Sequence, residues 1–184
     1  NSTLAPYTQN NQGWYYINDL TYDSKGNLWI INSNTSDILK LKEPNGTWSK
    51  FNLGYSSAGR SARKIYADYF DNIWVVMKGN GVIGYKPGSN VQSTSDDKRI
   101  HLNSANELGE MWPSSNVSAI TMDYDNELWI GTDKGFCILY NSNEAFEKTP
   151  GSYKVQRPKI STQQVGDDEF SETQYVLGYT SITD

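Results

Sequence analysis

Asp123-Tyr124-Asp125-Asn126-Glu127-Leu128-Trp129-Ile130 has two counterparts earlier in the chain, centred on Trp29 and Trp74. Each of the three tryptophans follows an aspartate by six residues and an aliphatic residue by nine. The aspartates are Asp23, Asp68 and Asp123, and the aliphatic residues are Leu20, Ile65 and Ile120. The tryptophans are spaced by 45 and 55 residues. Features that recur in register over three copies identify an internal repeat.

The residues around each tryptophan predict antiparallel strands joined by tight turns. An apolar segment leads into a polar turn, the tryptophan strand follows, and a second turn with glycine precedes a third apolar segment. Looser outer strands are expected at 47–51 and 99–102. Four antiparallel strands recurring at roughly 45 residues are typical of propeller blades. We therefore expect an all-β chain, a β-propeller fragment of about three to four four-stranded antiparallel blades whose ring is incomplete.

The repeat also predicts the domain organisation: residues 1–184 form a single partial propeller that is divided into blades. Blade 1 is expected at about 14–55, blade 2 at about 60–104 and blade 3 at about 115–175. Residues 141–174 lack the repeat pattern and are expected to form an outer-strand excursion of blade 3. Residues 179–184 resemble the beginning of an inner strand, so a further blade would start there.

Hydrophobic residues of the repeat are expected to hold neighbouring blades together. One blade cannot cover both of its own faces, so the second-strand tryptophan should pack against the next blade. The repeated aspartates are expected to cap turns by accepting backbone N–H groups, since the spacing of a calcium-binding EF-hand loop is absent. The predicted blade core comprises Leu20, Trp29, Ile65, Trp74, Ile120 and Trp129.

Composition excludes several functional classes. Aromatic residues make up 13% of the 184 residues, which is far above the content of a disordered segment. The net charge is −5 and the basic residues are scattered, so nucleic acid is not an expected partner. No apolar run approaches the roughly 18 residues that a membrane-spanning helix needs.

The sequence offers few residues for catalysis. His101 is the only histidine and falls on a predicted outer strand, while Cys137 lies in an apolar stretch that predicts a core position. Zinc sites and nucleophilic triads therefore lack their usual residues, and the acidic pairs at 96–97 and 167–169 fall in polar loops. We predict no catalytic residue, no metal, no cofactor and no enzymatic activity. A polysaccharide-active enzyme fragment is kept as an alternative, because propellers also carry such sites.

A binding face is predicted from strand direction. Successive strands alternate, so the turns between second and third strands emerge at the same end as the segments that join blades. Aromatic, basic and amide side chains there suit a glycan or a protein surface. An alternative is that Trp14 and Trp112 only cover the junction between blades. The predicted ligand-binding face comprises Trp14, Tyr16, Arg60, Lys78, Asn80, Trp112, Asp133, Lys134 and Tyr179.

The third repeat resembles a known family. Val117-Ser118-Ala119-Ile120, Asp123 and Leu128-Trp129-Ile130-Gly131-Thr132, followed by Gly135 and Tyr140, are similar to the two-component regulator propeller repeat. Such repeats form periplasmic sensor propellers of hybrid two-component systems in Bacteroidetes. A narrower resemblance, from Asn18 to the end of the chain, is to the propeller component of a type IX secretion system.

These resemblances imply a non-enzymatic interaction module of a larger exported protein, either a secretion-system scaffold or a binder of glycan or protein. The alternative they imply is a periplasmic propeller that senses glycans for a hybrid histidine kinase. Both place the chain in the periplasm or at the cell surface, with partners that are proteins of an outer-membrane or periplasmic assembly, or a glycan. The sequence leaves open the ligand, the blade number, the oligomeric state, the origin of the fragment, and the choice between a secretion-related and a sensory role.

Overall fold

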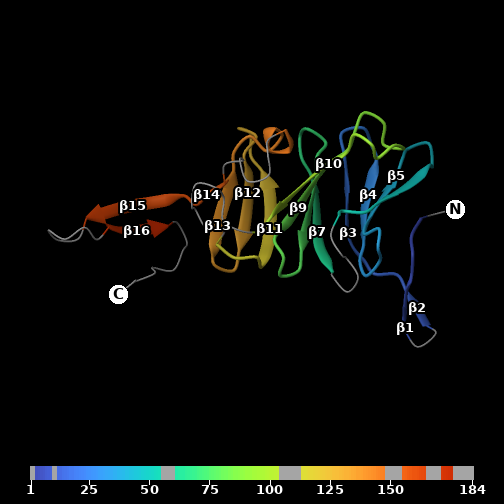
Figure 1. Cartoon of the computed structure of the whole chain (residues 1–184), viewed down its shortest axis with the longest axis horizontal. Helices are drawn as coiled ribbons and strands as arrows, with labels where there is room; N and C mark the ends of the chain where they lie inside the picture. Colours follow the sequence, from blue (N-terminus) through green and yellow to red (C-terminus); the bar gives the residue numbers. More distant parts are fainter. Residues whose placement is uncertain are drawn as a thin grey trace. The chain divides into compact units, whose positions relative to one another are not determined.

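The computed structural model describes residues 3–9, 12–54, 61–103, 113–147, 155–164 and 171–175. Within these ranges the chain is all-β, and its only helix is a 3₁₀ turn, η1, at Glu144–Phe146. Three four-stranded antiparallel sheets are present, each with its strands in sequence order (Figure 1). The prediction of an all-β propeller architecture is confirmed. In this described part, no helix is long and apolar enough to cross a membrane.

Each four-stranded sheet is one blade, and each contains one copy of the repeat. Blade 1 consists of β3 (Ile17–Tyr22), β4 (Leu28–Asn32), β5 (Leu39–Lys42) and β6 (Trp48–Phe51). Blade 2 consists of β7 (Ala62–Ala67), β8 (Ile73–Met77), β9 (Val82–Lys86) and β10 (Lys98–Leu102). Blade 3 consists of β11 (Val117–Met122), β12 (Leu128–Thr132), β13 (Gly135–Leu139) and β14 (Val155–Gln156).

The chain divides into two compact units. Residues 1–102 hold blades 1 and 2, and residues 103–184 hold blade 3. Each unit also contains a two-stranded hairpin that belongs to no blade: β1 (Tyr7–Gln9) with β2 (Gln12–Trp14), and β15 (Lys159–Gln164) with β16 (Ser171–Tyr175). The second hairpin lies in the segment predicted as an outer-strand excursion. The arrangement of both units in one propeller, and a further blade at 179–184 outside the described residues, stay predictions.

Blades 1 and 2 are joined by a hydrophobic cluster in which Trp29 is central. Its indole has no exposed surface, and its ring centroid lies 5.4 Å from that of Phe51 and 6.0 Å from that of Tyr85 in blade 2. The second-strand tryptophan of blade 1 therefore packs against the neighbouring blade, as expected. Burial of a large side chain stabilises a fold by roughly 1.5–3 kcal/mol, so this cluster is the main attraction between the two sheets.

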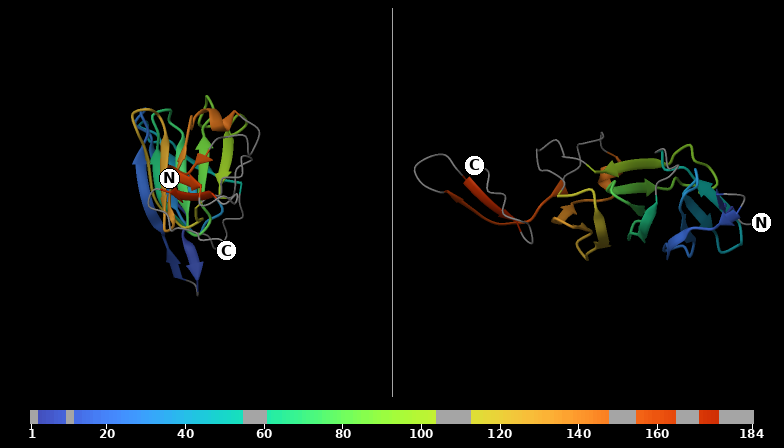
Figure 2. Two further views of the ribbon diagram at one scale, coloured as in Figure 1. Left: turned by 90° about the vertical axis from the view of Figure 1, so that its left-hand side faces the viewer. Right: turned by 90° about the horizontal axis from the view of Figure 1, so that it is seen from below.

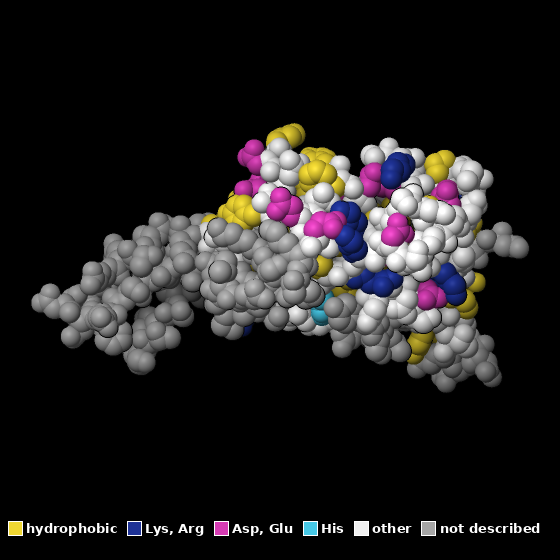
Figure 3. All heavy atoms as spheres, turned by 45° about the horizontal axis from the view of Figure 1, so that its top comes forward, with side chains coloured by type: hydrophobic (Ala, Val, Ile, Leu, Met, Phe, Trp, Pro, Cys, Tyr) yellow, Lys and Arg dark blue, Asp and Glu magenta, His cyan; other side chains and the backbone are white. Residues whose placement is uncertain are grey.

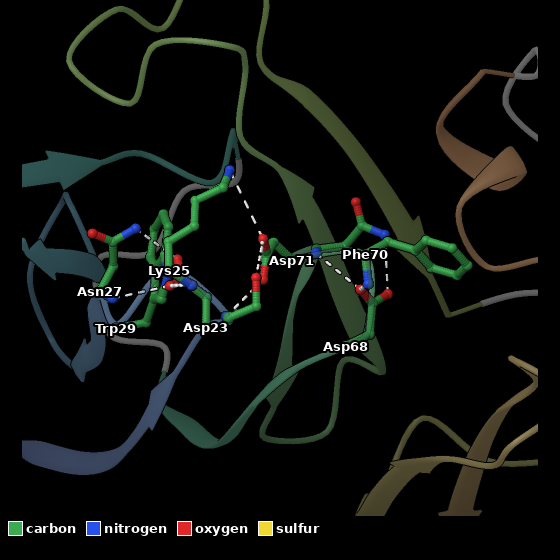
Figure 4. A network of polar contacts seen from close by, with 9 residues as sticks. Asp23, Lys25, Asn27, Trp29, Asp68, Phe70 and Asp71 are labelled. Carbon is green, nitrogen blue, oxygen red and sulfur yellow. Dashed lines mark hydrogen bonds and ion pairs between the residues drawn. The ribbon is translucent and has the colours of Figure 1, made fainter.

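Polar contacts join the same two blades around the cluster. The backbone N–H and hydroxyl of Ser24 both donate to the carboxylate of Asp71, each at 2.8 Å (Figure 4). At the inner strands, the Ile65 N–H donates to Asp19 Oδ2 at 3.1 Å. These contacts fix the register of one sheet against the other, which the hydrophobic cluster alone would not do.

The predicted core position of Leu20 is wrong. Its side chain is 53% exposed, whereas Ile65, at the equivalent position of blade 2, is 7% exposed. Leu20 pairs with Ile30 and so lies on the face of blade 1 opposite to Trp29. In blade 2 the equivalent face packs against blade 1, but in blade 1 it is turned away from blade 2. Among the other predicted core residues, Trp74 is fully buried, and Ile120 and Trp129 are half-buried.

Candidate interaction surface

In every blade, the turn between the second and third strands is bonded to the residue that precedes the inner strand. The Ser33 N–H donates to the Tyr16 carbonyl at 2.8 Å, and the Lys78 N–H donates to the Ser61 carbonyl at 3.0 Å. In blade 3 the Asp133 N–H donates to the Asn116 carbonyl at 3.3 Å. The two kinds of segment from which the binding face was predicted therefore lie at one end of each blade.

In blade 1 this end carries a run of exposed rings. Trp14, Tyr15 and Tyr16 are 42%, 60% and 42% exposed. The Tyr16 ring meets the Tyr7 ring edge to face, with centroids 5.9 Å apart. Since Tyr7 and Trp14 are opposite each other in the β1–β2 register, the hairpin and the residues that follow it form one aromatic surface. We call residues Tyr7, Trp14, Tyr15 and Tyr16 the aromatic surface.

Two buried polar side chains form hydrogen bonds next to the aromatic surface. Asn32, the last residue of β4, has no exposed surface, and its Oδ1 accepts the Ala5 N–H at 2.8 Å. The Ser33 hydroxyl, also buried, accepts the Ala62 N–H at 3.1 Å, which ties the β4–β5 turn to the beginning of β7. These bonds connect the residues next to the aromatic surface to the strands of blades 1 and 2.

In blade 2 the same end carries a cation and an amide. The Lys78 side chain is exposed and Asn80 is half-buried in the β8–β9 turn. The Nε2 atom of His101, on the outer strand, lies 2.8 Å from the Asn80 carbonyl oxygen. The sequence predicted a strand position for His101 but gave no signal for this support of the turn, because the contact joins residues 21 positions apart.

In blade 3 the equivalent turn is charged. Asp133 accepts a hydrogen bond from Asn116 Nδ2 at 3.1 Å. Hydrogen bonds from the Ser114 and Asn116 side chains hold the pKa of Asp133 below its usual value. Lys134 is exposed, and its N–H donates to the Thr132 hydroxyl at 3.1 Å.

The predicted face is thus only partly assembled in the structure. Blade 1 brings Trp14 and Tyr16 together, and the Ser33–Ala62 contact puts the Lys78 turn at the same end of residues 1–102. Asp133 and Lys134 belong to the second unit. Three predicted residues lie outside the described residues: Arg60, Trp112 and Tyr179.

The opposite end of each blade is built around the repeated aspartates, shown for blades 1 and 2 in Figure 4. Each aspartate accepts two backbone N–H groups of its turn, so the predicted capping role is confirmed. It also accepts the indole N–H of the tryptophan six residues later. These distances are 2.9 Å for Asp23–Trp29, 2.8 Å for Asp68–Trp74 and 2.6 Å for Asp123–Trp129. The constant six-residue spacing was the sequence signal for this bond.

The described residues provide neither a reactive thiol nor a cluster of metal ligands. Cys137 is fully buried, and burial raises the pKa of its thiol to about 12, so it stays protonated and unreactive at neutral pH. In the part of the chain that the structure describes, no three His, Cys, Asp or Glu side chains could together hold a metal ion. Figure 3 shows acidic and basic side chains interspersed on one face.

The sheets and the repeat define this chain as a β-propeller protein. Residues 111–134 match the two-component regulator propeller family. No curated protein matches the chain in sequence.

Solved structures share the fold. PorZ, described as an essential surface component of the type IX secretion system of Porphyromonas gingivalis, superposes with a TM-score of 0.72 at 22% identity. This match covers 93% of the chain and 24% of PorZ. The extracellular domain of BT4673 from Bacteroides thetaiotaomicron, described as part of a hybrid two-component system, gives 0.54 at 19% identity, covering 93% of the chain and 24% of the domain. Virginiamycin B lyase from Staphylococcus aureus gives 0.53 at 12% identity, covering 94% and 53%. The chain therefore spans about a quarter of the first two proteins, and at these identities the likeness is one of fold.

Proposed function

We propose that this chain is a non-enzymatic interaction module of a larger exported protein, and that it binds its partner through the aromatic surface. The observation that carries the proposal is the run of exposed rings at Trp14, Tyr15 and Tyr16. Contiguous exposed apolar patches mark interaction sites, and tryptophan and tyrosine are the residues most enriched in binding hot spots.

The contacts that hold Tyr16 in place support the same proposal. Tyr16 is fixed through its carbonyl by Ser33 and through its ring by Tyr7. Rings that are already ordered lose little conformational entropy when a partner covers them. Lys78, exposed at the same end of blade 2, would add a charge that orients the ligand.

The wider role we propose is that of a scaffold in an outer-membrane or periplasmic assembly. The fold similarity to PorZ supports this role, since PorZ is a surface component of a secretion system. The partner would be a protein of that assembly or a surface glycan, and the chain would be located in the periplasm or at the cell surface.

A second function is favoured by a specific observation, the match of residues 111–134 to the two-component regulator propeller family. In that case the aromatic surface would receive a glycan, and binding would be signalled to a histidine kinase elsewhere in the protein. The full-length gene product separates the two functions. Kinase modules after a membrane-spanning helix would favour sensing, whereas a small terminal β-domain would favour secretion.

A glycan array, together with photo-crosslinking from position 15 in the native host, tests the aromatic surface. We expect Trp14→Ala and Tyr16→Ala each to weaken binding of the captured glycan or protein by at least about tenfold. Tyr124→Ala is the matched control, because Tyr124 is 96% exposed on a turn of blade 3. Unchanged binding in both blade 1 variants would remove the aromatic surface from the proposal, and turnover of a glycan would replace binding by catalysis.

A further inference from the structure

The β1–β2 hairpin has sheet edges that the blades do not cover. It extends beyond the four strands of blade 1 (Figures 1 and 2). In the described ranges β1 pairs only with β2, with Tyr7 opposite Trp14, Thr8 opposite Gly13 and Gln9 opposite Gln12. Each strand therefore has one edge whose N–H and C=O groups face away from its partner. Two-stranded hairpins are marginally stable alone, so addition of further strands is favourable.

This edge also lacks the charges that are found on the outer strands of blades 1 and 2. Lys50 on β6 forms an ion pair with Asp37 at 2.9 Å, and β10 begins with the exposed Lys98 and Arg99. Residues 1–18, in contrast, contain no Asp, Glu, Lys or Arg. Natural proteins place charges on sheet edges to prevent pairing with other chains. An extended, uncharged edge next to exposed aromatic residues is therefore suited to pairing.

We propose that the free edge of β1 pairs antiparallel with the β1 edge of a second copy of this chain. Two-fold pairing of identical strands is self-complementary, as a symmetric dimer requires. It would produce a four-stranded sheet, β2-β1-β1-β2, with as many strands as each blade. The chain carries a net charge of −5, so like charges oppose association, and contact through the uncharged residues 1–18 keeps them out of the interface.

The strand register identifies the residue that decides the pairing. β1 ends at Gln9 and β2 begins at Gln12, which is its partner in the register. In hairpins with a two-residue connection, the flanking residues form the hydrogen-bonded pair that closes the hairpin. Hydrogen-bonding direction alternates along an antiparallel strand, which turns the N–H and C=O of Thr8 to the free edge. The inference is separate from the proposed function, because it uses the backbone of β1 and leaves the rings of Trp14, Tyr15 and Tyr16 to a ligand.

Sedimentation velocity over a series of protein concentrations tests this pairing. We expect a monomer–dimer equilibrium whose dissociation constant rises at least about tenfold in Thr8→Pro, which lacks the N–H, and in Thr8→Lys, which adds an edge charge. Thr8→Ser is the matched control and should dimerise like the unmodified chain. Thr8 is exposed, so circular dichroism and melting temperature should be the same in all three variants.

Trp14→Ala separates this inference from the proposed function. It removes a ring but keeps the backbone of β1, so dimerisation should persist while ligand binding falls. A chain that stays monomeric at millimolar concentration would overturn the inference. A dimer that is equally stable in Thr8→Pro and Thr8→Lys would also overturn it, because its interface would then lie elsewhere.

Discussion

The turns that follow the inner strands of blades 2 and 3 share one backbone design but differ in the residue four positions after the aspartate. In blade 2, Asp68 Oδ1 accepts the N–H groups of Phe70 and Asn72, both at 2.9 Å. Its Oδ2 accepts the Asn72 amide at 3.0 Å and the Trp74 indole at 2.8 Å. All four bonds reach one buried carboxylate, so both oxygens of Asp68 are engaged beside the tryptophan of blade 2.

In blade 3, Glu127 stands where blade 2 has Asn72. Asp123 still accepts the N–H groups of Asp125 and Glu127 at 3.0 Å each, and the Trp129 indole at 2.6 Å. The Glu127 carboxylate cannot supply the fourth bond, since an ionised carboxylate is only an acceptor. Burial, followed by the charges of Asp123 and Asp125, raises the pKa of Glu127.

The comparison distinguishes the hydrogen bonds that form the turn from the one that accompanies burial of the tryptophan. The turn does not need the side-chain amide bond, because blade 3 forms the same turn with a glutamate in place of the asparagine. The fourth bond, from the Asn72 amide, occurs where the indole is fully buried, at Trp74, whereas Trp129 is half-buried. Hydrogen bonds contribute more, and unpaired groups cost more, away from water. Blade 2 should therefore depend on its aspartate more strongly than blade 3.

The largest effect is expected from Asp68→Ala. This variant leaves the indole N–H of Trp74 and the donors of Asn72 without an acceptor inside the blade, and each buried unpaired group costs about 1–3 kcal/mol. We expect a loss of roughly 3–5 kcal/mol in the free energy of unfolding, measured by urea denaturation. Asp123→Ala is the matched variant in blade 3 and should lose less. Equal losses in the two variants would show that burial of the indole does not determine how much its hydrogen bond to the aspartate contributes to stability.

The next largest effect comes from giving blade 2 the residue of blade 3. Asn72→Glu removes the amide donor and puts a second carboxylate beside Asp68 in a buried turn, which we expect to cost about 2–4 kcal/mol at neutral pH. Asn72→Gln keeps an amide of the same length and controls for size. The deficit of Asn72→Glu relative to Asn72→Gln should shrink at acidic pH, as the new carboxyl becomes protonated and can donate. A deficit that is independent of pH would point to a packing defect.

These turns also show what the sequence could and could not predict. The spacing of Asp23, Asp68 and Asp123 from their tryptophans was sufficient for the blades, the strands and the capping role, because each follows from a local periodic pattern. The hydrogen bond from each indole N–H to the aspartate was not predicted, although the constant six-residue spacing was a signal for it. Leu20 was misplaced because equivalent positions of a repeat are buried only where another blade covers them.

The interaction surface was harder to predict than the fold. Trp14 and Tyr16 stood out as aromatic residues outside the repeat, but their hairpin did not, because β1 and β2 are only three residues long and lack a regular pattern. The contact of His101 with Asn80 joins an outer strand to a turn and depends on tertiary structure. Local sequence patterns determine the blades, whereas the interaction surface depends on contacts between residues that are far apart in the sequence.

A smaller effect is expected when blade 3 is given the network of blade 2. Glu127→Gln introduces an amide that can donate to Asp123 and removes a carboxylate from a crowded turn. We expect it to stabilise blade 3 by about 1 kcal/mol, measured as increased hydrogen-exchange protection of β11–β13. Asp125→Asn removes a charge without adding a donor to the network, so it separates relief of repulsion from the new bond. Equal gains in both variants would assign the whole effect to charge.

The smallest effect is a pH dependence that only blade 3 should show. The pKa of Glu127 is raised above its ordinary value of 4.5, so its contribution to stability is full below that pH and is lost as the pH rises through the folded-state pKa. The pKa of Asp123 is lowered, chiefly by the N–H of Glu127, so its contribution is present above its unfolded value and lost only in stronger acid.

Hydrogen-exchange protection of β11–β13, corrected for the intrinsic rate, should therefore fall as the pH rises from about 4.5 towards neutrality. The change should be small, because Glu127 lies close to solvent, which screens its charge. In Glu127→Gln the same strands should lose this pH dependence, and β7–β9 of blade 2 provide an internal reference, since Asn72 does not titrate. If the unmodified protein and Glu127→Gln give parallel profiles, then Glu127 is not the group responsible, and the difference between the two turns lies in hydrogen bonding alone.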